Sequence, residues 1–485
     1  QGSVWLYSAT NMTVNVTLRR NSSPWEDFAL SQVALAPNQW TLVTTKGYFN
    51  EAVDGRLQIR PLGVGTLYVD DASLIDLDIG SNKVFYVSNN GDDVLNIGTK
   101  FNKPFKTIQK AADSMSAGDI CEIRGGTYRE TVTPKSGISG SKMKFCNYGN
   151  EIVTINGTDL LTGWTNAGLS GLPYVYSTSI STGIYYTASN QLFVNGDMYG
   201  EARFPNNTET ALLTPTLATI DSVTSTSVTD DALIKPTDDY WKNAALWVLA
   251  DAGWISVRTN ITASAGATGN ITFTTPMQYY PKAGNKYYIT DSLNALDTAK
   301  EWFYNINNGK VYLWLAGNGN PSSATVEIKK RQYGFKLAGK SEIEIKGINL
   351  FATGIETDSA SSNISIDGTT AKYVGHGVKE YAGVKLYGSN LELKNSVIQY
   401  GSRYLVDING TSNRLVNCLI DTGDYEATID QLVMISGGRN HLVSNNTIRE
   451  AGRSCIGARG TDCQIQYNDV YNAGRMTKDL GVFYQ

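Results

Sequence analysis

The chain has 485 residues, with 45 acidic and 41 basic side chains and a formal net charge of −4. This length exceeds one ordinary domain and can bury a large core, while the weakly negative charge offers no basic footprint for nucleic acid. No apolar run is long enough to cross a bilayer as a helix. No signal peptide opens the sequence, so we expect a mature, trimmed or fragmentary chain.

The composition fits an extracellular β-rich protein that handles sugars. The chain holds 28 Tyr, 9 Trp and 47 Gly, and aromatic rings stack on sugar faces, although Tyr is also an ordinary strand residue. Sequons such as those at Asn260, Asn270 and Asn409 would carry glycans in a eukaryotic host. The five cysteines match no zinc pattern, so we expect buried apolar roles, with a disulfide between Cys455 and Cys463 as the alternative.

Residues 1–78 predict a partial β-sandwich. Apolar and polar residues alternate between frequent turns, and 40–43 and 67–74 are two of the expected strands. The stretch Tyr-Val-Asp-Asp-Ala-Ser-Leu at 68–74 resembles the last strand of jelly-roll carbohydrate-binding modules. Because the region covers only part of such a module, its first strands are expected to be missing. The region is therefore either a sugar-binding fragment or a packing domain that caps a solenoid.

Residues 79–184 predict the capped start of that solenoid. A strand at 84–87 is followed by one amphipathic helix, for which Thr107 is the expected N-cap and Ile108 opens the buried face. The strand at 120–123 comes next. A short helix of this kind covers the open edge of a first coil.

Four motifs in this region resemble pectate-lyase-like β-helix proteins. There they form the N-terminal cap and the first coil, and many members are secreted glycoside hydrolases or polysaccharide lyases. The resemblance implies a right-handed parallel β-helix that acts on carbohydrate. The motifs are Phe85-Tyr86-Val87-Ser88, Lys103-Pro104-Phe105-Lys106-Thr107-Ile108, Gly118-Asp119 and Gly125-Gly126-Thr127-Tyr128-Arg129-Glu130.

Residues 185–332 break the regular pattern. The stretches 191–196, 301–304 and 309–314 resemble parts of the β-rich insertion that interrupts the β-helix in several bacterial glycoside hydrolases. The resemblance implies that this insertion forms one wall of a substrate cleft. A purely structural β-domain is the alternative.

Residues 333–485 predict a stack of coils. Six short apolar strands begin at 345, 366, 393, 415, 443 and 465, a repeat of about 22 residues, often with Asn or Gly in third place. This period is typical of a β-solenoid with tight turns, whereas the frame of a leucine-rich repeat is absent. No polar cap follows the last coil, so further residues are expected beyond it. We therefore expect an all-β fold, namely a right-handed parallel β-helix with a short N-terminal capping helix, a β-rich insertion and an N-terminal β-sandwich fragment.

The coils at 372–383 and 421–431 are longer than the rest, and solenoids place such additions on a binding face. The second holds a dense group of acids, and a glycoside hydrolase needs two carboxyl groups. In the hydrolases that the chain resembles, an Asp-x-Gly strand like that at 479–481 lies near the cleft. A solvated acidic loop and a calcium site are the alternatives, and no other cofactor is implied. The candidate catalytic residues are Asp421, Asp424, Glu426, Asp430 and Asp479.

The coil alignment brings a second set of residues into register, five places past each aligned strand. Its three arginines would bind the acidic groups of a polysaccharide, or would instead bond to turn carbonyls and to acids such as Glu450. On the following strands, Lys385 and Asp407 should face outward, as an ion pair rather than as a catalytic pair. The candidate substrate-binding residues are His376, Arg403, Tyr425, Arg453 and Arg475.

Three functions fit these patterns, all with a polysaccharide as partner. The first is a secreted or cell-surface glycoside hydrolase that uses a carboxylate pair. The second is a polysaccharide lyase, in which Lys, Arg, His or Tyr removes the proton beside a uronate while calcium or Arg neutralises the acid. The third is a non-catalytic glycan-binding or structural surface protein. A hydrolase makes only new reducing ends, whereas a lyase also makes an unsaturated sugar that absorbs in the near ultraviolet.

Overall fold

The computed structural model describes residues 2–21, 26–46, 55–74, 82–180, 190–208, 211–275, 277–377 and 382–484. The chain divides into two compact units, residues 1–81 and 82–485, which are described here one at a time.

The first unit consists of two three-stranded antiparallel sheets around an apolar core. Alternate residues of its strands are buried, so that Val4, Leu6, Val14 and Val16 pack together with Leu35. The expected β-rich fragment is therefore present in this region. One sheet holds β4 (Thr41–Thr45), β1 (Gly2–Ser8) and β6 (Leu67–Leu74), and the other holds β3 (Asp27–Leu35), β2 (Met12–Arg20) and β5 (Gly55–Pro61).

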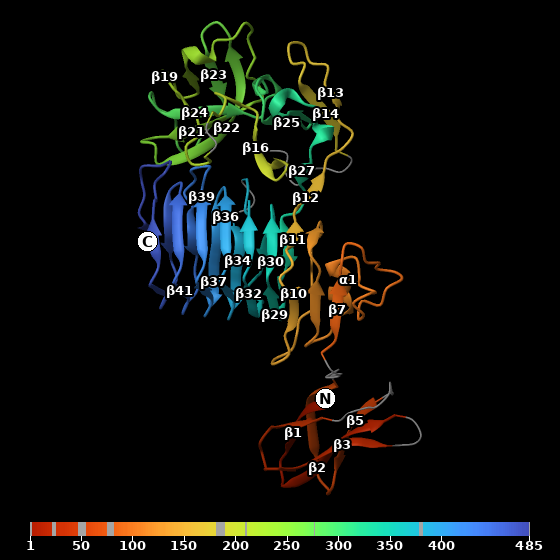
Figure 1. Cartoon of the computed structure of the whole chain (residues 1–485). Helices are drawn as coiled ribbons and strands as arrows, with labels where there is room; N and C mark the ends of the chain where they lie inside the picture. The colour runs from red at the N-terminus through yellow and green to blue at the C-terminus, as the bar shows by residue number, and fades with distance from the viewer. Residues whose placement is uncertain are drawn as a thin grey trace. The chain divides into compact units, whose positions relative to one another are not determined.

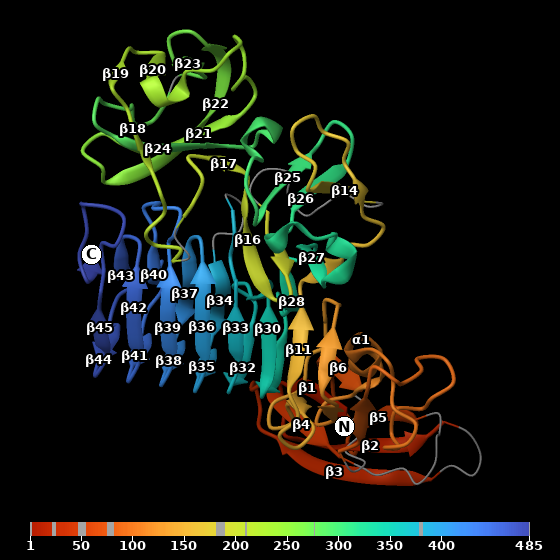
Figure 2. The ribbon, with the colours of Figure 1, turned by 45° about the horizontal axis from the view of Figure 1, so that its top comes forward.

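The second unit is built on a parallel β-helix, as expected, and its coils stack side by side in Figures 1 and 2. Each complete coil places one strand on each of three faces. Face A holds β7 (Val84–Val87), β8 (Ile120–Ile123), β10 (Met143–Asn147), β29 (Ser341–Lys346), β32 (Ser362–Asp367), β35 (Glu392–Lys394), β38 (Arg414–Val416), β41 (Leu442–Ser444) and β44 (Gln464–Gln466).

Faces B and C continue each coil after its face-A strand. Face B holds β9 (Gly126–Tyr128), β11 (Val153–Asn156), β30 (Ile348–Phe351), β33 (Thr370–Lys372), β36 (Val397–Gly401), β39 (Leu419–Gly423), β42 (Thr447–Ala451) and β45 (Asp469–Tyr471). Face C holds β28 (Tyr333–Lys336), β31 (Gly354–Glu356), β34 (Ala382–Ser389), β37 (Tyr404–Thr411), β40 (Gln431–Ile435), β43 (Ser454–Ala458) and β46 (Phe483–Tyr484).

The turn residues explain the sequence repeat. The residue between the face-A and face-B strands has a left-handed backbone, and in five of the six aligned strands it is Gly or Asn. These residue types adopt positive φ at the lowest steric cost. The third place of the repeat is thus the A-to-B corner, occupied by Gly347, Gly368, Asn395, Asn417, Asn445 and Tyr467.

The helix α1 (Ile108–Ser114) begins where the sequence predicts. The Thr107 hydroxyl accepts a hydrogen bond from the Lys110 amide, and Ile108, Ala111 and Ala112 are buried against the first coils. Apolar residues therefore continue from the cap into the interior of the β-helix. All five cysteines lie in the described ranges and are free, so the alternative of a Cys455–Cys463 disulfide is not realised.

The β-rich insertion separates β11 on face B from β28 on face C. Its strands begin with β12, before the expected boundary at residue 185, because β12 pairs with β27 near the end of the insertion. The two ends meet, since the amides of Lys330 and Arg331 both donate to the Gly157 carbonyl at 2.8 Å. On either side of the insertion the β-helix stays in register, and Phe145 of β10 pairs directly with Ile345 of β29.

The insertion contains two sheets and four short 3₁₀ turns among its described residues. The first sheet has the order β12 (Thr158–Leu160), β27 (Val326–Lys329), β15 (Leu192–Val194), β16 (Asp197–Glu201), β25 (Glu301–Asn305), β26 (Lys310–Trp314), β14 (Val175–Ser179) and β13 (Thr165–Asn166). The second has the order β17 (Arg203–Phe204), β24 (Lys286–Thr290), β21 (Ala245–Ala250), β22 (Ile255–Ala265), β23 (Asn270–Phe273), β20 (Ser227–Thr229) and β19 (Ser222–Val223), with β18 (Ala218–Thr219) also on β24. The turns are Asp231–Leu233, Leu293–Ala295, Ala316–Asn318 and Pro321–Ser323.

Candidate active site

The candidate site lies at the corner where the chain passes from face B to face C. The insertion leaves the β-helix at this corner, and so do the long connections after β33, β39 and β45. Of the loop expected at 372–383, residues 378–381 lie outside the described residues. The insertion and the long connections therefore all lie at the corner that precedes face C.

Asp407 lies on that outer side, in register with Lys385 and Met434 of the neighbouring coils. Its side chain is nevertheless buried, and the Tyr387 hydroxyl donates to its Oδ2 at 2.5 Å. Its Oδ1 has no hydrogen-bond partner among the described residues. Burial raises the pKa of Asp407, although hydrogen bonds from Tyr387 and Ser436 oppose the rise.

The expected ion pair between Lys385 and Asp407 does not form. The two residues are neighbours in register, but the Lys385 ammonium lies over the ring of Tyr333, 5.4 Å from its centre. Asp407 takes its hydrogen bond from a neutral phenol instead. The alternation along the strand predicts the outward position of this carboxyl, but no signal in the sequence marks it as a candidate site residue.

Asp430 lies one residue before β40, four residues before Met434, which is the register partner of Asp407. It is buried and forms an ion pair with Arg403 of the preceding coil. The Tyr404 hydroxyl donates to Asp430, and burial together with the charges of Asp430 and Asp407 raises the pKa of Tyr404. Tyr404 is therefore bonded to Asp430 and lies within electrostatic range of Asp407 on its own strand.

The Asp424 side chain is held by hydrogen bonds within the 424–430 loop. Its Oδ1 accepts hydrogen bonds from the amide and the hydroxyl of Thr428, at 2.8 and 2.6 Å. Its Oδ2 is buried without a hydrogen-bond partner among the described residues, and desolvation raises its pKa well above the usual value. The Asp424 carboxyl therefore joins residues 424 and 428 of the loop through hydrogen bonds.

Asp421 lies on β39 of face B, three residues before Asp424. Its Oδ2 accepts from the Gln399 amide at 3.0 Å and pairs with Arg449 at 3.3 Å. These residues are in register on three successive coils. Asp421 is thus part of a polar ladder across face B, and it is not brought together with Asp430.

Glu426 lies where the loop contacts the insertion. Its backbone carbonyl accepts from the Trp247 indole at 3.1 Å and from the Ser256 hydroxyl at 2.6 Å. Trp247 and Leu249 pack against Ala427 in a small apolar cluster. The backbone of this segment therefore attaches the insertion to the β-helix.

Asp479 lies in the last described B-to-C connection. The guanidinium of Arg453 donates to its Oδ2 and to its backbone carbonyl, both at 2.8 Å. The Asp479 side chain is 47% exposed, whereas Arg453 is buried and lies over the ring of Tyr484. Asp479 is thus an accessible acid held at the rim of face C.

Each of the three arginines that the coil alignment places in a row has a carboxylate partner. Arg403 pairs with Asp430, Arg453 with Asp479, and Arg475 with Glu450 at 3.4 Å. These contacts match the alternative of bonding to neighbouring acids. They leave less of each guanidinium to bind the acidic groups of a polysaccharide.

His376 and Tyr425 come together, although 49 positions separate them in the chain. The Nδ1 atom of His376 lies 2.7 Å from the Tyr425 hydroxyl. Burial lowers the pKa of His376 to about 3, so the imidazole is neutral at physiological pH. The pair contributes no cation that would neutralise a uronate.

No three His, Cys, Asp or Glu side chains of the described residues converge as a metal site would require. In the same ranges, no helix has the length and apolar character of a membrane span.

Comparisons with known proteins agree with the fold. No family model matches the chain. The uncharacterised protein YwoF of Bacillus subtilis (strain 168) is 48% identical over 79 residues, which is 16% of each of the two chains. A solved glycoside hydrolase aligns with 82% of this chain and 85% of its own, at 15% identity and a TM-score of 0.64. XylC in complex with xylose aligns with 79% of this chain at 13% identity and a TM-score of 0.50, and the match spans 62% of XylC.

Proposed function

We propose that the chain is a glycoside hydrolase that cleaves a polysaccharide at face C, with Asp407 as the general acid and Asp430 as the second carboxyl. The observation that carries the proposal is the environment of Asp407. This carboxyl is buried on the outer side of a strand, has a raised pKa and has one oxygen without a partner. A pKa raised by burial is what a general acid requires.

The two carboxyls take different roles in this proposal. Burial raises the pKa of Asp407 against the opposing hydrogen bond from Tyr387, and Asp407 donates a proton to the glycosidic oxygen as the bond breaks. Asp430, which pairs with Arg403, serves as the base or nucleophile. Tyr404 donates a hydrogen bond to Asp430, and the charge of Asp407 contributes to the raised pKa of Tyr404.

The remaining acids have other roles in this proposal. Asp424 supports the loop and Asp421 belongs to the ladder on face B, while the accessible Asp479 at the rim contacts sugar hydroxyls. Secretion or display at the cell surface accompanies an enzyme that acts on extracellular glycans. The structural likeness to the XylC–xylose complex adds pentose polymers to the substrates that should be tested first.

The test compares the wild type with Asp407→Asn and Asp430→Asn on a panel of neutral and acidic polysaccharides. We expect each variant to lose about 10²–10⁴-fold in kcat, the usual contribution of a positioned acid or base. The matched control is Asp421→Asn, which alters a buried, ion-paired Asp on face B and should keep most of the activity. Reducing ends and near-ultraviolet absorbance are read together.

Two outcomes would contradict the proposal. Full activity in Asp407→Asn would show that Asp407 is not the general acid. Near-ultraviolet absorbance of the product would indicate a lyase instead of a hydrolase. Binding without cleavage of any polymer would indicate the non-catalytic glycan-binding function.

A further inference from the structure

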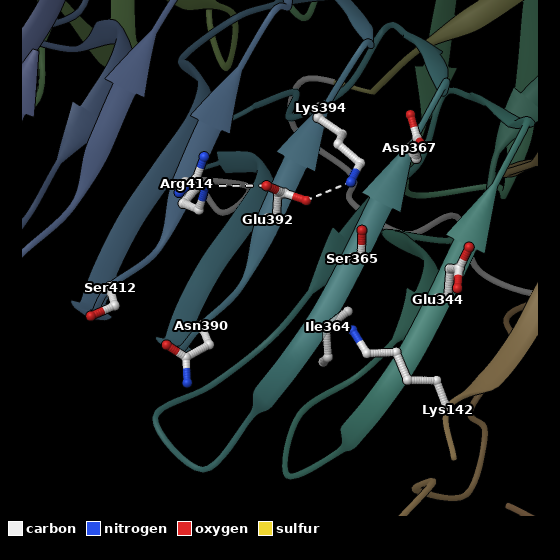
Figure 3. A pocket seen from close by; sticks show the side chains of 10 residues that line it. All are labelled: Lys142, Glu344, Ile364, Ser365, Asp367, Asn390, Glu392, Lys394, Ser412 and Arg414. Atoms are coloured by element: carbon white, nitrogen blue, oxygen red, sulfur yellow. Dashed lines mark hydrogen bonds and ion pairs between the residues drawn. The ribbon is translucent and has the colours of Figure 1, made fainter. Parts of the chain in front are cut away.

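Face A carries a groove that has no part in the proposed reaction (Figure 3). Its cavity volume is about 430 Å³, and it extends from the edge of β10 across four later strands of face A to β38. It therefore runs along the axis of the β-helix, on a different face from Asp407. Its lining residues are Lys142, Glu344, Ile364, Ser365, Asp367, Asn390, Glu392, Lys394, Ser412 and Arg414.

The groove arises from one short side chain in a row of long ones. Glu344, Ser365 and Glu392 occupy the same register position on successive strands, and Arg414 follows Glu392. Adjacent strands lie about 4.8 Å apart, so the two glutamates stand roughly 10 Å apart with only a serine hydroxyl between them. Figure 3 shows Ser365 on the floor between the longer side chains.

Ion pairs hold the polar groups of this groove in fixed positions. The Lys394 ammonium lies 2.7 Å from Oε2 of Glu392, and Nε of Arg414 lies 3.1 Å from its Oε1. At the other end, Lys144 pairs with Glu344 at 3.4 Å. Acceptors and donors are thus arranged before a ligand arrives, which reduces the entropic cost of binding.

The charges of the lining select the class of ligand. Lys142, Lys394 and Arg414 are balanced by Glu344, Asp367 and Glu392, three cations against three anions. An acidic polymer would meet as many carboxylates as ammonium or guanidinium groups. A neutral ligand rich in hydroxyls satisfies both kinds of group, because a hydroxyl donates to a carboxylate and accepts from a cation.

We propose that this groove is a second saccharide site, which holds a segment of a neutral polysaccharide along the β-helix axis without cleaving it. The choice of a glycan as ligand rests on the proposed function. The groove keeps the polymer on the enzyme while another segment occupies face C.

The experiment fills the groove and measures polymer binding. Ser365→Trp places a large ring on the floor of the groove. Gln464→Trp introduces the same side chain at the same register position on β44, outside the groove. Both are made in the full chain carrying Asp407→Asn, so that the polymer stays intact. Retention is measured by affinity electrophoresis in soluble arabinoxylan, galactomannan or polygalacturonate. We expect Ser365→Trp to weaken binding to a neutral polymer about tenfold, or 1.4 kcal/mol, and Gln464→Trp to leave it unchanged.

A second variant and an activity assay complete the test. Glu392→Ala removes an acceptor and two ion pairs without adding bulk, and it should weaken binding in the same direction. In the active chain, Ser365→Trp should lower kcat/KM on the polymer and leave a short chromogenic glycoside unaffected.

The outcomes separate this proposal from the proposed function. Equal retention of the two Trp variants, tighter binding to polygalacturonate than to the neutral polymers, or no binding by the parent chain would each overturn the second site. A wild type that cleaves nothing, with retention still lost in Ser365→Trp, would overturn the hydrolase and support the groove.

Discussion

Asp407 and Asp424 show how two buried carboxyls differ by the surroundings of one oxygen. Each has one oxygen in a hydrogen bond and one without a partner among the described residues. In Asp424 the bonds come from Thr428 of the same loop, so the group is enclosed by its own segment. In Asp407 the bond comes from another coil, and the residue lies on the outer side of a strand. The two carboxyls therefore differ in the segment that supplies the hydrogen bond, whereas the unpartnered oxygen is buried in both.

The pH dependence of stability should report the state of Asp424. Its pKa is raised in the folded protein, so the folded state holds the proton more tightly than the unfolded chain. Stability is therefore lost as the pH rises above about 4, by up to about 1.4 kcal/mol per pH unit while the folded carboxyl stays protonated. Asp424→Asn keeps an acceptor for Thr428 and lacks this titration, so its stability relative to the wild type should rise between pH 4 and 7. Urea midpoints at several pH values measure the difference.

The control for this measurement is Asp462→Asn, which changes an exposed Asp in a turn. It provides the baseline for an Asp-to-Asn substitution at the surface. A difference for Asp424→Asn that does not change with pH relative to this baseline would contradict a raised pKa of Asp424.

At the scale of the strand and turn, side chains stack inside the A-to-B corner. Asn446 is buried, accepts from the Cys418 amide at 2.8 Å and donates to the Leu415 carbonyl at 3.0 Å. Asn468 repeats the pattern one coil later, since it accepts from the Asn446 amide and donates to the Val443 carbonyl. These amides satisfy backbone groups that the turn removes from the sheets.

Replacing one member of this stack should be costly. Asn446→Ala leaves a buried amide and a buried carbonyl without partners, and we expect a loss of about 2–4 kcal/mol in unfolding free energy. Urea denaturation measures it, with Gln466→Ala on the exposed side of β44 as the control. Equal midpoints for the two variants would mean that water replaces the asparagine.

The same elements show what the sequence could and could not predict. The helix cap, the repeat and its Gly and Asn corners depend on neighbouring residues, so the β-helix could be read from the pattern. The pairing of β12 with β27 joins segments far apart in the chain, and no local signal marks it. The burial of Asp407 was missed because an outward strand residue is normally exposed, whereas here Tyr387 and other neighbours cover it.

At the scale of the whole second unit, the insertion contacts the β-helix at several places, and one of them is the 424–430 loop. The insertion has its own apolar core, while Trp247 and Leu249 meet Ala427 of the 424–430 loop in a separate small cluster. The amide of Ser256 also donates to the Ala427 carbonyl at 2.8 Å. The loop that carries Asp430 is therefore ordered in part by contacts with the insertion, which is distant from it in sequence.

Trp247→Ala should loosen that loop. It removes a buried indole and its bond to the Glu426 carbonyl, a change that costs about 3–5 kcal/mol in a typical core. We expect faster hydrogen exchange in residues 424–430 and lower kcat/KM. Trp314→Ala is the control, because that indole donates to Asn318 within the insertion. Equal exchange of the loop in both variants would mean that the β-helix alone orders it.

The meeting of Gly157 with Lys330 and Arg331 has a consequence for how such a protein can change over evolution. The two ends of the insertion lie within one hydrogen bond of each other, so the β-helix needs only a gap at one corner to accommodate the segment. The strands on both sides of the gap pair as neighbours, with Phe145 beside Ile345. A lineage can therefore lengthen, shorten or exchange this segment while the strands of the β-helix keep their register, and the 424–430 loop is the part of the β-helix that has to adapt to the exchange.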